Sequence, residues 1–250
     1  MATDLQGRHA VVTGGSRGIG RAIAAALANS GARVTILGRD RQALDRVVGA
    51  GHAHCAVTAD VTDLDSVRAA FAGIEPVDVL VANAGGAVSA PFAKSDAALF
   101  QSMLDVNLMG AVHASQAVLG SMTERGFGRI VAVASTAGLK GYPYVSAYCA
   151  AKHAVIGFVR ALAVETAATG VTVNAVCPGF ADTDLVSGSI DRILAKTGRT
   201  REAALTELVK HNPQKRLIQP EEVADTVVWL CGENARSVTG QAIVVAGGEI

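Results

Sequence analysis

The sequence predicts an α/β fold in which one doubly wound parallel sheet of seven strands carries helices on both faces. From residue 8 onward, short β-branched apolar runs alternate with longer stretches of helical period, which is the pattern of repeated βαβ units. The short runs are also apolar throughout, as strands covered on both faces should be. Because crossovers between parallel strands are almost always right-handed, a doubly wound sheet is the simplest arrangement of these units.

Each strand is predicted from a short apolar run rich in β-branched residues. In chain order the seven runs are residues 9–14, 33–38, 54–60, 78–85, 129–135, 171–178 and 241–247. The stretches between them show helical spacing, beginning with Ile19, Ile23, Ala26 and Leu27. The longest helices are expected at about 98–123, 146–169 and 220–232, and Ser146 is expected to cap the second of them. The sequence contains no linker, repeat or low-complexity segment, so we predict a single domain over residues 1–250.

The stretch from residue 180 to 219 breaks the alternation. It contains short helical candidates at 189–196 and 200–211 and no strand candidate. Long excursions of this kind in compact domains are usually lids or binding segments. We therefore expect 180–219 to be a substrate-binding lid, with a structural cap over a sheet edge as the alternative.

Composition and charge exclude several classes of protein. The 250 residues include 22 basic and 22 acidic side chains, and the sequence pI is about 7.0. Nucleic-acid or anionic-membrane binding needs a net basic face, so neither partner is expected. The start of the chain lacks the layout of a signal peptide, and no apolar run reaches the roughly 20 residues that span a bilayer, so we expect a cytoplasmic protein. The four cysteines form no C-x-x-C pair, so we expect buried free thiols and no metal site.

A glycine-rich loop lies between the first predicted strand and the first predicted helix. Residues 13–20 read TGGSRGIG. Glycines here permit a tight turn, a close backbone approach to a pyrophosphate and close helix packing, while the helix N-terminus offers free N–H groups. The spacing is not G-x-G-x-x-G, so a glycine-rich turn without a ligand is the alternative for this motif taken alone. A bound dinucleotide would contact Gly14, Ser16, Arg17, Gly18, Ile19 and Gly20.

The end of the second strand bears on which dinucleotide would bind. An acidic residue there often binds the adenine ribose, whereas an arginine accommodates a 2′-phosphate. Here the strand ends in Gly38-Arg39, and Arg17 lies in the glycine loop, so two guanidiniums would converge on one phosphate. Residues 1–60 also hold seven arginines against four aspartates. We predict NADP(H) rather than NAD(H). An inward-turned Asp40 would weaken this preference, and two solvated surface arginines are the alternative.

Ser135, Tyr148 and Lys152 have side chains of complementary chemistry and lie within 18 residues of one another in the sequence. Tyr148 and Lys152 stand four residues apart on a predicted helix, and Ser135 ends a predicted core strand, where open α/β sheets place their ligand sites. Hydride delivery from a cofactor to a ketone creates an alkoxide that must be protonated. A neighbouring ammonium lowers the pKa of a tyrosine, and a serine hydroxyl polarises the carbonyl oxygen. Without Ser135, the spacing of Tyr148 and Lys152 would indicate only two neighbouring side chains on the surface of a helix.

Several motifs together resemble the short-chain dehydrogenase/reductase family. They are TGGSRGIG, Asp60-Val61, NAG at 83–85, Asn107 in DVNLMG, Ser135, Tyr148-x-x-x-Lys152 and PGFADT at 178–183. They occur in order and at the family's usual spacings over essentially the whole chain. The resemblance implies a Rossmann-type catalytic domain that reduces a ketone with NAD(P)H.

The resemblance also implies roles for individual residues. Besides the glycine loop and Arg39, the residues that it brings to the cofactor are Asp60 and Val61 at the adenine, Asn83, Ala84, Gly85, Tyr148 and Lys152 along the cofactor, and Pro178, Gly179 and Thr183 at the nicotinamide. Asn107 would complete a catalytic tetrad with Ser135, Tyr148 and Lys152 by positioning a water. Structural alternatives stay open: Asp60 as a helix cap, Asn107 as a helix irregularity and Thr183 as a loop residue. The family usually assembles as homotetramers through the two long helices, here 98–123 and 146–169, whose apolar residues could equally be core.

Within the family the chain most resembles 3-oxoacyl thioester reductases, from GRIVAVASTAG through SAYCAAKHAVIGF to GQAIVVAGGE. Fatty-acid synthesis members commonly carry a basic residue before the glycine that precedes the sixth strand, where it helps dock acyl carrier protein. Thr169 stands at that position, which leaves acyl-CoA as a substrate beside the carrier-bound form. In the lid, an apolar acyl site would be walled by Leu185, Val186, Ile190, Ile193 and Leu194, and CoA phosphates would meet Lys196, Arg199 and Arg201.

Two other functions are weighed against the thioester reductase. One is a ketoreductase or alcohol dehydrogenase for bulky cyclic or aromatic ketones. The other, from a different class, is an NADPH-sensing regulator on the same fold, which typically would have lost Ser135, Tyr148 or Lys152. All three residues are present, which favours an enzyme.

Overall fold

The structure, a computed structural model, describes residues 3–198 and 200–250, and within α7 it leaves out the side chains of residues 185, 189, 192, 193 and 195–197. The described residues form one sheet of seven strands in the order β3-β2-β1-β4-β5-β6-β7, and every neighbouring pair is parallel. The strands are β1 (His9–Thr13), β2 (Arg33–Gly38), β3 (Cys55–Thr58), β4 (Val79–Ala82), β5 (Gly128–Val133), β6 (Val171–Pro178) and β7 (Ala242–Val245). The predicted fold class and all seven strand positions are confirmed, with ends that differ by a few residues.

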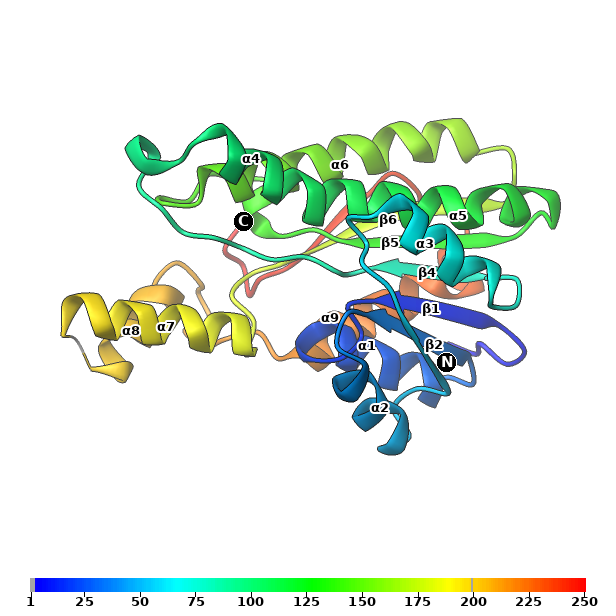
Figure 1. Ribbon diagram of the computed structural model, residues 1–250, viewed down its shortest axis with the longest axis horizontal. Helices are drawn as coiled ribbons and strands as arrows, with labels where there is room; N and C mark the ends of the chain where they lie inside the picture. Colours follow the sequence, from blue (N-terminus) through cyan, green and yellow to red (C-terminus); the bar gives the residue numbers. More distant parts are fainter. Residues whose placement is uncertain (1–2, 199) are drawn as a thin grey trace.

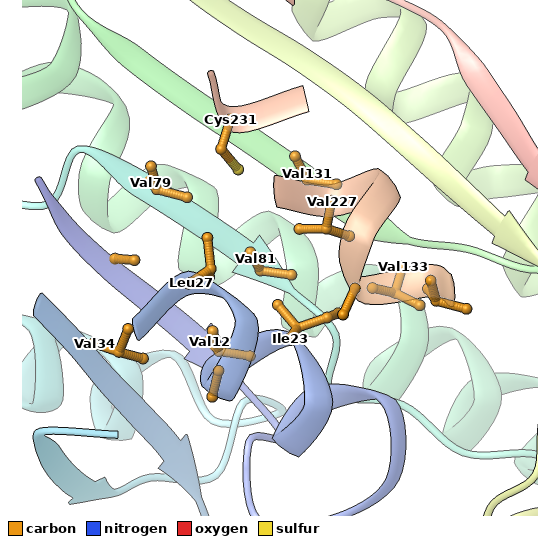
Figure 2. Packing of buried hydrophobic residues seen from close by; sticks show 14 of the residues in the cluster. Val12, Ile23, Leu27, Val34, Val79, Val81, Val131, Val133, Val227 and Cys231 are labelled. Atoms are coloured by element: carbon orange, nitrogen blue, oxygen red, sulfur yellow. The ribbon is translucent and has the colours of Figure 1, made fainter. Parts of the chain in front are cut away.

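Helices cover both faces of the sheet, as Figure 1 shows. One face carries α1 (Gly18–Asn29), α2 (Arg41–Gly49) and α9 (Pro220–Cys231). The other carries α3 (Leu64–Ala72), α5 (Gly110–Glu124) and α6 (Ser146–Thr166). Each strand sends alternate side chains to the two cores, so that Val12 packs beneath α1 while its neighbour Val11 packs on the opposite face. In Figure 2, Ile23 and Leu27 of α1 and Val227 of α9 meet the strand valines of the first core.

The long helix predicted at 98–123 is interrupted. It consists of α4 (Ala97–Leu104), a π-helical turn over Asp105–Met109, and α5. The π turn contains Asn107, so the irregularity that was considered for this residue is real. Turns of this type occur often at functional sites.

Two capping expectations need correction. Ser146 does not cap α6, because it is the first helical residue, and its buried hydroxyl has no hydrogen-bond partner among the described residues. The helix starts instead after Val145, without a side-chain cap. Asp60 does not cap α3 either, since the carboxylate of Asp63 accepts the N–H groups of the first turn.

By length and composition, α6 could cross a membrane. Its Val155, Val159 and Leu162 side chains are buried against the sheet, as in a core helix. This helix is therefore weak support for a membrane span.

The segment 180–219 contains α7 (Asp184–Thr197) and α8 (Arg201–Val209), which extend away from the layered body in Figure 1. α7 is longer than the candidate predicted at 189–196, and α8 is shorter than the candidate predicted at 200–211. An isolated parallel bridge, Ala181 to Ile218, joins the two ends of the segment where no strand was expected. The N–H of Asp182 donates to the Ile218 carbonyl (2.9 Å), and the N–H of Ile218 donates to the Phe180 carbonyl (2.9 Å). These two backbone hydrogen bonds therefore connect the beginning of the segment with its end.

Candidate active site

The sequence-predicted site residues meet at one edge of the sheet. Parallel strands place all their carboxyl ends on the same side, and the strand order reverses between β1 and β4, where open sheets form a ligand crevice. The residues that follow these strand ends are Gly14 after β1, Arg39 after β2, Asp60 after β3, Asn83 after β4, Ser135 after β5 and Gly179 after β6. Residues from six separate regions of the sequence therefore lie along the same edge of the sheet.

The glycine loop is shaped by close approaches that a side chain would block. Gly14 has a φ of +67°, and a Cβ there would lie 2.9 Å from the Cα of Ala84. At Gly20 a Cβ would lie only 2.3 Å from the Gly14 carbonyl oxygen, which explains the tight packing of α1 on the loop. Gly18 has a φ of +51°, and its missing Cβ would point at the Thr183 methyl, 3.3 Å away. The glycines thus form a backbone cradle at the N-terminus of α1, which is suited to a phosphate.

Thr13 and Asn83 fasten this cradle to β4. The Thr13 hydroxyl accepts the N–H groups of Asn83 (3.1 Å) and Ala84 (3.0 Å). In return, the Asn83 amide donates to the carbonyls of Thr13 (3.0 Å) and Gly14 (3.1 Å). The Asn83 side chain therefore binds the backbone of the glycine loop directly. Sequence reasoning did not single out Thr13, although a hydroxyl residue that follows Ala10, Val11 and Val12 at the end of the first strand is the signal that would have found it.

Arg39 and Asp40, which follow β2, make different contacts. The Asp40 carboxylate is the N-cap of α2 and accepts the Ala43 N–H at 3.0 Å, so it is not turned into the crevice. The Arg39 guanidinium is 78% exposed and lies 3.9 Å from the Asp60 carboxylate. Hydrogen bonds from Thr62 lower the pKa of Asp60, and the Arg39 charge acts in the same direction. A permanently charged pair therefore stands at the ends of β2 and β3.

Arg17 is exposed and lies immediately before α1. It lines a cleft of about 290 Å³ whose other walls include Gly18, Arg21, Asp182 and Thr183. The cleft lies between the glycine loop and the start of the segment 180–219. A negatively charged group in the cradle would meet the Arg17 side of this cleft.

Ser135, Tyr148 and Lys152 form the reactive group of the crevice. Tyr148 and Lys152 lie one turn apart on α6, with the Lys152 Nζ 5.7 Å from the centre of the Tyr148 ring. The Lys152 ammonium is buried and donates to the Val133 carbonyl at 2.8 Å. Ser135 follows two residues after Val133, and its hydroxyl accepts the Ala137 N–H at 3.1 Å and lies close enough to Tyr148 to lower the pKa of that phenol. A proton donor, a hydrogen-bond donor and a cation therefore share one small region.

Burial sets the pKa values of this group when no ligand is bound. It raises the pKa of Tyr148 to about 12, against the smaller effect of the Ser135 hydrogen bond. It lowers the pKa of Lys152 to about 8. The expected lowering of the tyrosine pKa is therefore not seen in the structure without ligand, where loss of solvent dominates the pKa of Tyr148.

The buried lysine gives a testable pH dependence of stability. Between pH 8 and 10.5, approximately, Lys152 is neutral in the folded chain but protonated in the unfolded chain, so unfolding takes up a proton. The free energy of unfolding of the wild type should therefore rise with pH relative to Lys152→Met, by up to about 1.4 kcal/mol per pH unit. Urea denaturation at several pH values measures this difference. In the control Lys94→Met, which changes an exposed lysine, the difference should stay flat. A constant difference for Lys152→Met would contradict the burial of the ammonium.

Asn107 lies beside the lysine, across Gly85. The Asn107 amide donates to the carbonyls of Gly86 (3.0 Å) and Met103 (3.0 Å), and its Oδ1 accepts the Gly86 N–H (3.3 Å). A Cβ on Gly85 would lie 2.6 Å from the Asn107 Oδ1 and 3.6 Å from the Lys152 Nζ. The side chain of Asn107 thus holds the backbone of residues 85–86 against the lysine.

The end of β6 completes the crevice. The Gly179 N–H donates to the Val245 carbonyl at 3.0 Å, directly after Pro178. Thr183 is the N-cap residue of α7, its hydroxyl donates to the Ala181 carbonyl at 3.4 Å, and its methyl faces Gly18. Val61, the remaining predicted adenine neighbour, is buried, and its carbonyl oxygen lies 2.9 Å from the His113 ring Nδ1.

The segment 180–219 differs in detail from the expected acyl wall. Val186 and Ile190 are buried in a small core with Ala204, between α7 and α8, and Leu194 packs against it. Arg201 pairs with Asp191 at 3.2 Å within the segment. The expectations for Leu185, Ile193, Lys196 and Arg199 lie outside the described residues and side chains.

Comparisons with known proteins agree with this geometry. A family model described as short chain dehydrogenase matches residues 8–193. A putative ketoacyl reductase of Streptomyces coelicolor is 39% identical over 249 residues, which cover 96% of this chain and 95% of that protein. An acetoacetyl-CoA reductase of Rhizobium meliloti is 36% identical, covering 97% of this chain and 98% of that protein. The crystal structure of an actinorhodin polyketide ketoreductase variant with NADPH has a TM-score of 0.91 and 38% identity, and covers 100% of this chain and 99% of that one.

Proposed function

This chain belongs to the short-chain dehydrogenase family, and we propose that as an oxidoreductase of that family it reduces a 3-oxoacyl thioester to the 3-hydroxyacyl form with NADPH, reversibly. The observation that carries the proposal is the placement of Tyr148, Lys152 and Ser135 at the end of β5, beside the glycine cradle. This arrangement combines a proton donor with a dinucleotide site.

The crevice fits a dinucleotide, because Gly14 and Gly18 leave open the positions that Cβ atoms would fill next to the α1 N-terminus. The residues that would hold the cofactor are Gly14, Ser16, Arg17, Gly18, Ile19, Gly20, Arg39, Asp60, Val61, Asn83, Ala84, Gly85, Tyr148, Lys152, Pro178, Gly179 and Thr183. When bound, the nicotinamide supplies the hydride that reduces the carbonyl carbon.

The protein's own groups handle the carbonyl oxygen. Ser135 donates a hydrogen bond to that oxygen and holds it near Tyr148. As the C–O double bond becomes single, the Tyr148 hydroxyl gives its proton to the developing alkoxide. The Lys152 ammonium stabilises the phenolate left behind, and Asn107 keeps the backbone of Gly85 against Lys152. The tyrosine is protonated again from solvent before the next turnover.

NADP(H) is proposed over NAD(H) on the arrangement after β2. An acidic side chain facing the adenine ribose favours NAD(H). Here Asp40 is engaged as a helix cap, while Arg39 is exposed at the same strand end. Arg17 is proposed as the second guanidinium on the 2′-phosphate.

The thioester class rests on the relatives named above, which include an acetoacetyl-CoA reductase and a ketoacyl reductase. We favour CoA thioesters over carrier-bound ones, because Thr169 replaces the basic residue that helps dock a carrier protein. The segment 180–219 is proposed as the substrate lid of a single domain. A homotetramer and a cytoplasmic location also stay proposals, and the 81% exposed Val164 on α6 fits an assembly surface on that helix.

The decisive assay follows NADPH absorbance with a panel of ketones. We expect turnover of acetoacetyl-CoA, with kcat/KM at least about 100-fold above that for a bulky aromatic ketone. Acetoacetate without CoA serves as the matched control for thioester recognition. No turnover of acetoacetyl-CoA, together with reduction of the aromatic ketone, would sink the thioester proposal.

One observation favours the second candidate, reduction of bulky cyclic or aromatic ketones. The rings of Tyr142 and Phe180 pack edge to face with centroids 5.9 Å apart, and the Tyr142 hydroxyl contacts Thr136, the residue after Ser135. An aromatic wall close to Ser135 suits a planar substrate. The same assay panel decides between the two.

A further inference from the structure

A buried carboxylate outside the residues discussed so far lies close to the crevice. The Glu249 side chain, from the penultimate residue, is only 2% exposed. Its Oε1 accepts the Tyr142 hydroxyl at 2.6 Å and lies 2.9 Å from the Lys140 ammonium. A buried charge is costly unless it is paired and hydrogen-bonded, and here both conditions are met. Glu249 therefore holds its two partners in a defined geometry.

These partners belong to the loop that connects Ser135 with Tyr148. The Tyr142 hydroxyl also lies 2.7 Å from the Thr136 hydroxyl, and the Tyr142 ring packs edge to face on Phe180. Burial and the Glu249 hydrogen bond raise the pKa of Tyr142, so the phenol stays protonated and is the donor. One carboxylate thus fixes the orientation of an aromatic ring whose hydroxyl contacts Thr136, the residue after Ser135.

The same C-terminal turn contacts both ends of the segment 180–219. At the first end, a Cβ on Gly179 would lie 3.3 Å from the Glu249 Oε2. At the second end, Gly247 (φ +62°) and Gly248 (φ +91°) lie against Asn212 and Pro213, where added Cβ atoms would meet side-chain atoms at 2.3 and 3.3 Å. The turn therefore packs against Gly179, just before the segment, and against Asn212 and Pro213, near its other end, while the Ala181 to Ile218 bridge joins the two ends.

We propose that Glu249 is a positioning residue for the reduction: it holds Tyr142 against Phe180 as a fixed wall of the substrate site and anchors the base of the segment 180–219. This rests on the proposed function, because it assumes that the substrate occupies the crevice beside Ser135. Glu249 itself touches neither the cofactor cradle nor Lys152. Its effect on turnover passes through the ring of Tyr142 and through the base of the segment 180–219.

The kinetic test compares Glu249→Ala, Glu249→Gln and the surface control Glu124→Ala with the wild type. Glu249→Ala should raise KM for acetoacetyl-CoA about ten-fold, while Kd for NADPH stays within about two-fold. Glu249→Gln should recover most of the loss, because its amide oxygen still accepts the Tyr142 hydroxyl. In a double-mutant cycle, Tyr142→Phe and Glu249→Ala should not add, because both remove the same hydrogen bond. Unchanged KM in Glu249→Ala, or additive effects, would overturn the proposal.

A second readout does not depend on turnover. Hydrogen exchange of the Asp182 and Ile218 amides, which close the base of the segment, should be about ten-fold faster in Glu249→Ala than in the wild type, with β5 amides unchanged. Equal acceleration in β5 would mean a general loss of stability and would contradict an anchoring role, as would unchanged exchange at Asp182 and Ile218. If the wild type reduces no thioester, the proposed function fails, yet this exchange experiment still decides on the anchor.

Discussion

Tyr148→Phe is expected to lower kcat for ketone reduction by about 1000-fold while NADPH binding and folding are retained. The substitution removes one oxygen atom, which is the proposed proton donor. The ring itself stays packed, because it lies against the cluster of Met103, Ala147 and Ala151 on α4 and α6. Stopped-flow or steady-state absorbance at saturating NADPH measures kcat, and fluorescence titration measures cofactor Kd.

The size of this effect follows from the position of the hydroxyl. The Ser135 hydroxyl is close enough to lower its pKa, and the Lys152 ammonium lies 5.7 Å from the ring centre on the same helix. No other phenol can replace it, since Tyr142 is engaged with Glu249 and Tyr144 is 63% exposed. Without a proton donor the alkoxide has no acid of suitable reach, so the loss falls on the chemical step.

Tyr144→Phe is the matched control, because it deletes an exposed phenol from the same loop. Its kcat should stay within about two-fold of the wild-type value. If Tyr148→Phe also retained turnover within this range, Tyr148 would not be the acid. A loss of NADPH binding in Tyr148→Phe would instead assign the residue to the cofactor alone.

The fold was predictable because its signals are local. A parallel strand buried on both faces is mostly apolar, so β4 is visible as an uninterrupted apolar run, and β1, β5 and β6 as apolar runs that contain only a few polar residues. Helix ends were harder to predict, because Asp60 and Asp63 are both suitable capping residues and only the path of the chain places Asp63 at the cap. The π turn at Asn107 could not be predicted from the hydrophobic periodicity either, because it adds one residue to an otherwise regular helical pattern.

The parts of the candidate site that directly follow strands could be predicted from the sequence. Ser135, Asn83 and Arg39 each follow a strand, so their meeting at one edge needs only parallel pairing. The Glu249 contact could not be predicted, because Tyr142 is 107 residues away in sequence and no local pattern links the two. The pKa of Tyr148 could not be predicted either, because the raising effect of burial and the lowering effect of Ser135 can be compared only in three dimensions.

Arg39→Ala is expected to lower kcat/KM for NADPH by about 30-fold, or ~2 kcal/mol, with kcat/KM for NADH within about two-fold of the wild type. The reason is that only NADPH carries the 2′-phosphate, and Arg39 is the exposed cation at the end of β2 that would meet it. The carboxylate of Asp60 lies 3.9 Å from the guanidinium, at the end of the neighbouring strand β3.

Two further variants make the cofactor test specific. Arg39→Lys keeps the charge but lacks the planar fork of the guanidinium, so its NADPH kcat/KM should fall between those of the wild type and Arg39→Ala. Arg41→Ala is the matched control: Arg41 is also exposed and only two residues along the chain, but its guanidinium is engaged with Asp45 at 2.9 Å within α2. Its cofactor preference should equal that of the wild type. If Arg41→Ala changed the ratio of kcat/KM for NADPH to kcat/KM for NADH as much as Arg39→Ala, general positive charge would set the cofactor preference. If this ratio were unchanged in Arg39→Ala, the proposed phosphate contact would be refuted, and Asp40 would be the next residue to test as a ribose ligand.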